Sequence, residues 1–220
     1  MSAIVVVNPN SSRDVTAGID RALDSLRRPE GPEICCLTLA EGPPGIETEE
    51  HVQAVVAPLV ALVRRLDGEA AAFVDACFSD PGLAELRGAT ARPVFGIGEC
   101  AYRRAAADSG RFGVISLFAE SADRHRRYVE SLGFGDALAG DRPVGLGVTA
   151  LGDDPAATFA RLVAVGTDLR DTDGAAAVVL GCTGMAPHRA ALQDALAVPV
   201  IDPAQAAVAA ALDVIDGRGE

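Results

Sequence analysis

AAAVVLGCTGM, residues 175–185, is a short apolar run that ends in Gly181, Cys182, Thr183 and Gly184. An unbroken run of small and β-branched residues is typical of a parallel strand that is buried on both faces. The cysteine therefore follows the carboxyl end of a predicted strand, which is where open α/β sheets bind their ligands. The neighbouring glycines allow backbone N–H groups to approach a substrate closely.

The chain contains this pattern twice. Residues 70–83 read AAAFVDACFSDPGL, and aligning them with the segment that begins at residue 175 places Cys77 opposite Cys182, 105 positions apart. Further matches join PVFGI at 93–97 to PVIDP at 199–203 and, more loosely, IVVVNPNSS at 4–12 to FGVISLFAES at 112–121. Three matching segments in the same order at nearly constant offset indicate an internal duplication. Each half presents one cysteine at a strand end.

Strand and helix patterns alternate along the chain, which predicts parallel sheets covered by helices. We expect strands at 4–7, 33–39, 70–76, 94–97, 113–117, 143–148, 175–180 and 200–201, and helices at 14–26, 48–66, 83–86, 99–107, 121–132, 155–172, 188–196 and 203–215. The predicted fold is α/β, with two pseudo-symmetric Rossmann-like (flavodoxin-like) domains and an active site in the interdomain cleft. Residues 1–99 with 203–220 form the first domain, residues 100–202 the second, and the last helix returns to the first domain.

Composition excludes several classes of function. The chain has 220 residues and a formal net charge of -12, which argues against nucleic acid or an anionic membrane as a partner. Its apolar runs are too short to cross a bilayer, and the start lacks a basic signal-peptide region, so we expect a cytoplasmic protein. All 19 basic residues are arginine, so a lysine Schiff base and a lysine-containing phosphate loop are excluded.

The cysteines and histidines point to thiol chemistry without a metal. The three histidines have no metal-ligand spacing, and the five cysteines include no C-x-x-C pair. Two cysteines at equivalent strand ends, each followed by small polar residues at a predicted helix start, would have lowered thiol pKa values. One thiolate can remove a proton from carbon and the second thiol can return one to the other face. We therefore predict inversion of a stereocentre by Cys77 and Cys182, without a cofactor or a metal.

Five segments carry a resemblance to a known family: VVVNPNSS, DACFSDPGL, PVFGIGE, VVLGCTGM and VPVIDPAQAA. They look like the aspartate/glutamate/hydantoin racemase superfamily, are most similar to its hydantoin and allantoin racemase branch, and span residues 4–207. The resemblance implies two pseudo-symmetric domains with substrate between them, Cys77 and Cys182 as the catalytic acid and base, and a hydantoin-type or allantoin-like substrate. The positions that match the family's substrate contacts are Asn8, Ser79, Ser116, Thr183 and Gly184.

The sequence also departs from the family pattern. Ser79 stands where hydantoin racemases often have glycine, and Ser116 begins a Ser-Leu-Phe segment in place of a threonine-rich one. Aspartate and glutamate racemases commonly carry Cys-Thr-His at the second cysteine, whereas Cys182 is followed here by Thr183 and Gly184. This difference favours a ring compound with an acidic carbon beside a carbonyl over an amino acid.

Alternatives remain open at this point. The same fold would suit an aspartate/glutamate-type racemase, a maleate isomerase-like enzyme or a malonate decarboxylase-like enzyme, and a two-lobed small-molecule binding protein would have inert cysteines. Retention of both cysteines argues against the decarboxylase. We expect a small-molecule substrate and a homo-oligomer. Capping or turn roles are expected for Asp80, Glu99 and Asp202, and packing roles for the remaining thiols, Cys35, Cys36 and Cys100.

Overall fold

The computed structural model describes residues 3–218 and divides into two compact units. The first unit comprises the chain up to Cys100 together with the segment from Ala204 onward. The second unit is the single segment Ala101–Pro203. The chain therefore passes from the first unit to the second within helix α4 (Ile97–Ser109) and returns at the start of helix α8 (Pro203–Ile215).

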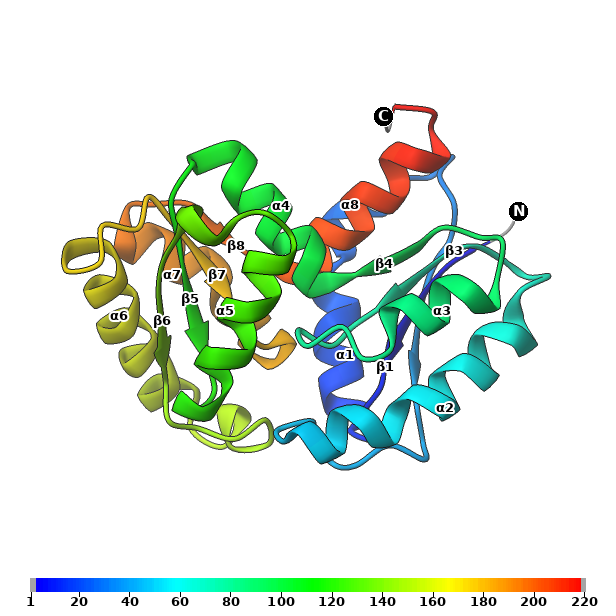
Figure 1. Ribbon diagram of the computed structural model, residues 1–220, viewed down its shortest axis with the longest axis horizontal. Helices are drawn as coiled ribbons and strands as arrows, with labels where there is room; N and C mark the ends of the chain where they lie inside the picture. The colour runs from blue at the N-terminus through cyan, green and yellow to red at the C-terminus, as the bar shows by residue number, and fades with distance from the viewer. Residues whose placement is uncertain (1–2, 219–220) are drawn as a thin grey trace. The chain divides into compact units, whose positions relative to one another are not determined.

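The first unit is built on a four-stranded parallel sheet with the strand order β2-β1-β3-β4. Figure 1 labels three of its strands, β1, β3 and β4. Its strands are β1 (Ala3–Asn8), β2 (Ile34–Thr38), β3 (Ala70–Asp75) and β4 (Val94–Gly96). Its other helical elements are α1 (Arg13–Ala22), η1 (Asp24–Leu26), α2 (Glu49–Leu66) and α3 (Leu83–Ala89).

Helices cover both faces of this sheet because successive strand side chains point to opposite sides. Ile4 and Val6 of β1 pack in one apolar cluster with residues of α1 and α8. Val5 and Val7 of the same strand pack in a second cluster with residues of α2 and α3. Burial on both faces explains why the central strand is an unbroken apolar run in the sequence.

Side chains at the helix starts account for several element boundaries. Ser12, Thr48 and Asp154 each accept a hydrogen bond from the backbone N–H three residues further on, as N-cap residues do. Helix α2 spans 18 residues and carries acidic residues in its first turn and arginines in its last. Within residues 3–218, no helix is both long and apolar enough to cross a membrane.

The second unit repeats the topology of the first, with the parallel strand order β6-β5-β7-β8. Its strands are β5 (Phe112–Ser116), β6 (Leu138–Pro143), β7 (Ala177–Leu180) and β8 (Val200–Ile201). Its helical elements are η2 (Ala119–Ser121), α5 (Ala122–Ser131), η3 (Gly135–Ala137), η4 (Ala150–Gly152), α6 (Pro155–Asp171), η5 (Thr183–His188) and α7 (Arg189–Leu196). The predicted α/β fold with two similar parallel sheets is confirmed.

One predicted strand was wrong. The sequence indicated a strand at 143–148, but β6 is Leu138–Pro143. This edge strand contains charged side chains, and each has a partner. Asp141 lies 2.6 Å from the His125 ring, and Arg142 pairs with Asp173 at 2.6 Å. A polar strand of this kind has no apolar run by which it could be recognised.

Candidate active site

Each predicted catalytic cysteine lies two residues beyond the end of a central strand. Cys77 follows β3, which ends at Asp75, and Cys182 follows β7, which ends at Leu180. The Cys77 side chain is half-buried, and Cys182 is buried with 8% of its surface exposed. Both thiols are free cysteines.

The two cysteine turns have the same backbone hydrogen bonds. In each, the residue before the cysteine donates its N–H to the neighbouring central strand, and the residue three positions after the cysteine donates to the cysteine carbonyl. These bonds join Ala76 N to Val7 O (2.8 Å), Asp80 N to Cys77 O (2.9 Å), Gly181 N to Ile115 O (2.8 Å) and Met185 N to Cys182 O (3.1 Å). The duplication therefore extends to the local geometry that holds each thiol.

Cys182 caps the short helix η5 that follows it. Its sulfur accepts the backbone N–H of Gly184 at 3.4 Å, and Thr183 is buried beside it in the chain. A donor aimed at sulfur favours the thiolate over the thiol. Gly184 has no room for a side chain, because an added Cβ would lie 2.9 Å from Leu151.

Asp80 ties the Cys77 turn to the start of α4. Its carboxylate accepts the backbone N–H groups of Gly98 at 2.9 Å and Glu99 at 2.7 Å. These groups belong to the first turn of α4, where N–H groups have no partner within the helix. The capping role expected for Asp80 is confirmed. Glu99 has a further contact, since its carboxylate pairs with Arg87 at 2.8 Å.

The geometry around Asp80 depends on glycine. A Cβ on Gly96 would lie 2.4 Å from the Asp80 carboxyl carbon, and a Cβ on Gly98 would lie 2.5 Å from the Phe78 carbonyl oxygen. Asp80 itself has a φ of +46°, a region in which aspartate and asparagine are tolerated better than most residues. The Asp80 carboxylate therefore occupies the space that a side chain at Gly96 would need.

Asn8 and Ser116, two of the predicted substrate contacts, end the central strands β1 and β5. Both are buried, with 1% and 0% of their surface exposed. The Asn8 amide donates to Asn10 at 2.9 Å and to Thr16 at 3.0 Å, so it organises the loop between β1 and α1. Contacts of Asn8, Ser79, Ser116, Thr183 and Gly184 with substrate stay predictions.

Asp75 is a functional candidate that sequence reasoning did not single out. It ends β3 with 2% of its surface exposed, and neither carboxylate oxygen has a hydrogen-bond partner among the described residues. Burial raises the pKa of this carboxyl well above its usual value, and the nearby charge of Asp80 raises it further. The available signal was the duplication itself, because Leu180 occupies the equivalent position in the second half.

Cys35 and Cys36, two further thiols of the first unit, have raised pKa values. Burial raises the pKa of Cys36 to about 12, with a further increase from Asp20. The pKa of Cys35 is also raised, first by burial and then by the adjacent Glu33. Thiols with raised pKa values are poor nucleophiles at neutral pH. The packing role predicted for these two residues therefore has a physical basis.

Two histidines also lie in the second unit. His125 is buried and its Nδ1 lies 2.6 Å from an Asp141 carboxylate oxygen. His188 stacks on Phe159 with ring centroids 6.0 Å apart, and burial lowers its pKa. Among residues 3–218, no group of three or more histidine, cysteine or acidic side chains is arranged to hold a metal ion.

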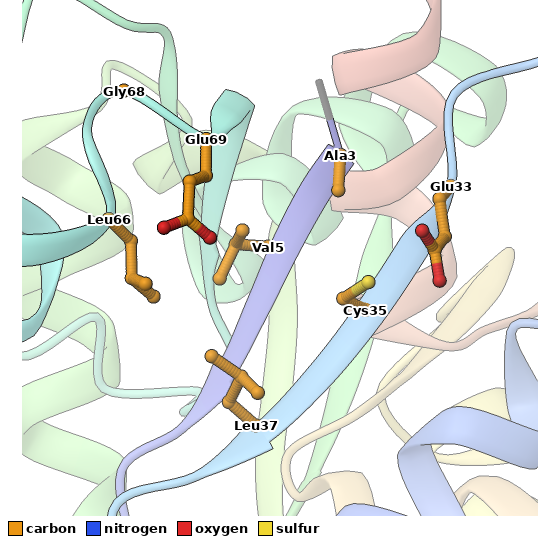
Figure 2. Close-up of a pocket in the computed structure, with 8 residues that line it drawn as sticks. All are labelled: Ala3, Val5, Glu33, Cys35, Leu37, Leu66, Gly68 and Glu69. Carbon is orange, nitrogen blue, oxygen red and sulfur yellow. The ribbon is translucent and has the colours of Figure 1, made fainter. Parts of the chain in front are cut away.

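A cavity of about 560 Å³ lies at the opposite end of the first sheet from Cys77. Figure 2 shows Val5, Leu37 and Leu66 forming its apolar wall, with Glu33 beside Cys35. The cavity lies toward the amino ends of β1, β2 and β3, whereas Cys77 follows the carboxyl end of β3. It contains none of the predicted site residues.

The chain is similar to known proteins over nearly its whole length. The family model described as Asp/Glu/Hydantoin racemase matches residues 4–211. A hydantoin racemase from Paenarthrobacter aurescens is 33% identical over 206 residues, which cover 93% of this chain and 87% of the relative. The solved allantoin racemase from Klebsiella pneumoniae matches with a TM-score of 0.90 and 30% identity, covering 100% of this chain and 89% of that one. The allantoin racemase from Pseudomonas fluorescens has a TM-score of 0.91 and 25% identity, covering 99% and 92% of the two chains.

Proposed function

Because this chain belongs to the Asp/Glu/hydantoin racemase family and is an isomerase of the racemase type, we propose that it inverts the stereocentre of 5-substituted hydantoins. Cys77 and Cys182 are the two proton-transfer groups in this proposal. Allantoin, the ureido-substituted hydantoin, falls within the same chemical class. The observation that carries the proposal is the pair of cysteine turns with matching hydrogen bonds at equivalent strand ends of the two units.

The reaction needs one proton removed and one returned. The stereogenic ring carbon lies beside a carbonyl, so its C–H electrons can move onto the carbonyl oxygen as an enolate when a thiolate takes the proton. The second cysteine, in its thiol form, then gives a proton to the opposite face of that carbon. The substrate is inverted, and the two thiols have exchanged their protonation states.

Local structure supports this use of the thiols. The Gly184 N–H that points at the Cys182 sulfur, 3.4 Å away, stabilises the thiolate form of that residue. Cys77 is half-buried and its thiol is free of a disulfide. Asn8, Ser79, Ser116, Thr183 and Gly184 are proposed to contact the substrate, since each lies at or just beyond the carboxyl end of a strand.

A ring substrate is favoured over an amino acid by the residues after the second cysteine. Cys182 is followed by Thr183, Gly184 and the fully buried Met185, so this turn lacks the histidine that is common in aspartate and glutamate racemases. The names of the relatives point the same way, because they are hydantoin and allantoin racemases.

Proton NMR in D2O tests the proposal. The purified protein is incubated separately with each enantiomer of a 5-substituted hydantoin and of allantoin, and the signal of the carbon-bound proton is followed together with optical rotation. We expect protein-dependent loss of that signal with inversion. Cys77→Ser and Cys182→Ser should each abolish inversion.

Cys36→Ser is the matched control, because it removes a thiol whose pKa of about 12 keeps it protonated. It should leave the rate within about twofold of the wild-type rate. If no proton exchanges on any of these compounds, the hydantoin assignment is wrong, and aspartate, maleate and substituted malonates become the next substrates to test. If Cys77→Ser or Cys182→Ser still inverts the substrate at the wild-type rate, the two-thiol mechanism is wrong.

A further inference from the structure

Asp75 and Asp80 bring two carboxyl groups together beside the Cys77 turn. Asp75 is the ladder partner of Gly96 in the parallel pair β3–β4. The Asp80 carboxyl carbon lies 2.4 Å from the position that a Cβ on Gly96 would occupy. Neighbouring strands lie about 4.8 Å apart, and paired side chains point to the same face. The Asp80 carboxyl fills the side-chain position of Gly96, so it lies about one strand spacing from Asp75 on that face.

The carboxyl groups of Asp75 and Asp80 have different surroundings, and these determine which of the two is ionised. The Asp80 carboxylate accepts two backbone N–H groups, from Gly98 and Glu99, which stabilise its ionised form. Among the described residues, neither Asp75 oxygen has a partner at hydrogen-bond geometry, the Cys77 backbone N–H acts on the carboxyl only weakly, and Asp75 is 2% exposed. Two carboxyl groups this close do not both ionise at neutral pH when one is buried without donors.

The face on which Asp75 lies is otherwise apolar. Val7, its ladder partner on β1, belongs to the cluster that packs against α2 and α3, as does Phe73 two positions earlier on β3. Gly96 is the partner on β4 and contributes no side chain. Asp80 is the charged group that acts on the Asp75 carboxyl, and the Cys77 backbone N–H acts on it more weakly.

The second half of the chain serves as an internal reference for this arrangement. At the same offset that aligns Cys77 with Cys182, Asp75 aligns with Leu180 and Asp80 with Met185. Leu180 and Met185 are both fully buried. The fold therefore accommodates apolar residues at both positions, and the first half keeps a buried carboxyl that costs stability when it has no partner.

We propose that Asp75 and Asp80 form a carboxyl pair that holds a single proton, carried by Asp75, and that the neutral Asp75 spares the Cys77 turn a second negative charge. With Asp75 neutral, Cys77 ionises beside one negative charge, that of Asp80. An ionised Asp75, two residues from Cys77, would place a second negative charge beside the thiolate and oppose its formation. The effect on Cys77 as a proton-transfer group rests on the proposed function, whereas the shared proton does not.

Infrared spectroscopy tests the shared proton without any substrate. At pH 7.5 we expect the wild-type protein to show the carbonyl stretching band of a protonated carboxylic acid. The band should shift in D2O and be missing from Asp75→Asn. A wild-type spectrum identical to that of Asp75→Asn in this region would overturn the proposal.

Alkylation of Cys77 tests the charge beside it. Iodoacetamide labelling is followed against pH by mass spectrometry of the peptides, and Cys182 in the same sample serves as the reference. Asp75→Asn replaces a neutral group by a neutral group of the same shape, so the midpoint for Cys77 should stay within about 0.3 pH units. A fall of one unit or more in Asp75→Asn would mean that Asp75 is ionised in the wild type, and the proposal would be wrong.

Kinetics of the racemase reaction tests the effect of a neutral Asp75 on Cys77. Asp75→Leu gives the first half the residue that the second half has and, like a protonated Asp75, carries no charge, so we expect kcat and KM within threefold of the wild-type values. Asp75→Asn, which keeps a hydrogen-bond donor, should stay within threefold of the wild-type kcat. If Asp75→Leu does not fold, Asp75→Ala takes its place. A change of tenfold or more in kcat in Asp75→Leu or Asp75→Ala would refute the effect on Cys77. A wild-type protein inactive on every hydantoin would refute the proposed function and leave the infrared and alkylation results valid.

Discussion

Replacing Asp80 by alanine removes the two hydrogen bonds that join the Cys77 turn to α4. The Asp80 carboxylate accepts from Gly98 at 2.9 Å and from Glu99 at 2.7 Å, and the Asp80 residue is 6% exposed. Each buried N–H left without a partner costs about 1–3 kcal/mol, and an N-cap replaced by alanine typically costs about 1 kcal/mol in total. Alanine also fits a φ of +46° less well than aspartate does. We expect Asp80→Ala to lower the free energy of unfolding of the first unit by about 3 kcal/mol.

Urea unfolding measured by far-ultraviolet circular dichroism gives this free energy, and hydrogen exchange at the two amides reports the local effect. Asp80→Asn keeps one acceptor and tolerates the positive φ, so it should cost about half as much. Asp24→Ala is the matched control, because Asp24 is an exposed residue whose ion pair with Arg27 contributes less than about 1 kcal/mol. The reasoning fails if Asp80→Ala and Asp24→Ala have the same unfolding midpoint, or if exchange at Gly98 and Glu99 is unchanged.

Further predictions concern a thiol, a carboxyl and a glycine. Cys36, with a pKa of about 12, should resist iodoacetamide at pH 8 while Cys77 reacts, and equal labelling of the two in peptide mass spectra would contradict this. The folded protein keeps a proton on Asp75, whereas the unfolded chain releases this proton above about pH 4. As the pH rises above about 4, the free energy of unfolding of the wild type relative to Asp75→Asn should therefore fall by up to about 1.4 kcal/mol per pH unit. The fall should stop at the pH at which the folded protein also releases the proton. Urea titrations at several pH values measure this slope, and a flat difference would refute it. Gly98→Ala forces a Cβ to 2.5 Å from a carbonyl oxygen and should lower Tm by several degrees, whereas Gly88→Ala, with open space around it in α3, should maintain or raise Tm.

The fold was predictable because its main signals are local or repeated. Buried parallel strands such as β3 and β7 are visible as apolar runs, and the near-constant offset between the halves reveals the duplication. The helix α8 was predicted with the bounds that the structure has, Pro203–Ile215, since proline marks its first turn and alanine dominates its length. The two cysteines could be singled out for the same reason, because each ends a recognisable strand.

What could not be predicted depends on contacts between distant parts of the chain. The strand β6 contains Asp141 and Arg142, and these charges become acceptable in a strand only because His125 and Asp173 lie next to them. The contact between Asp80 and the start of α4 crosses 18 positions of sequence and needs the glycines that surround it. In the sequence, Asp75 is also indistinguishable from an ordinary polar residue at the end of a strand. Its strand partner Gly96 and its burial are known only from the structure.

The place of α8 in the first unit has a consequence for the order in which the protein is made. The alanines, valine and leucine of α8 complete the apolar cluster on one face of β1, a strand from the other end of the sequence. During synthesis, the second unit is complete in sequence once residue 203 has left the ribosome, because it is one uninterrupted segment. The first unit must wait for α8, and until then α1 and the start of α4 pack on that face of its sheet without it. A nascent chain stopped just before α8 would thus carry a finished second half and an unfinished first half, so the half that is translated first is the last to be completed.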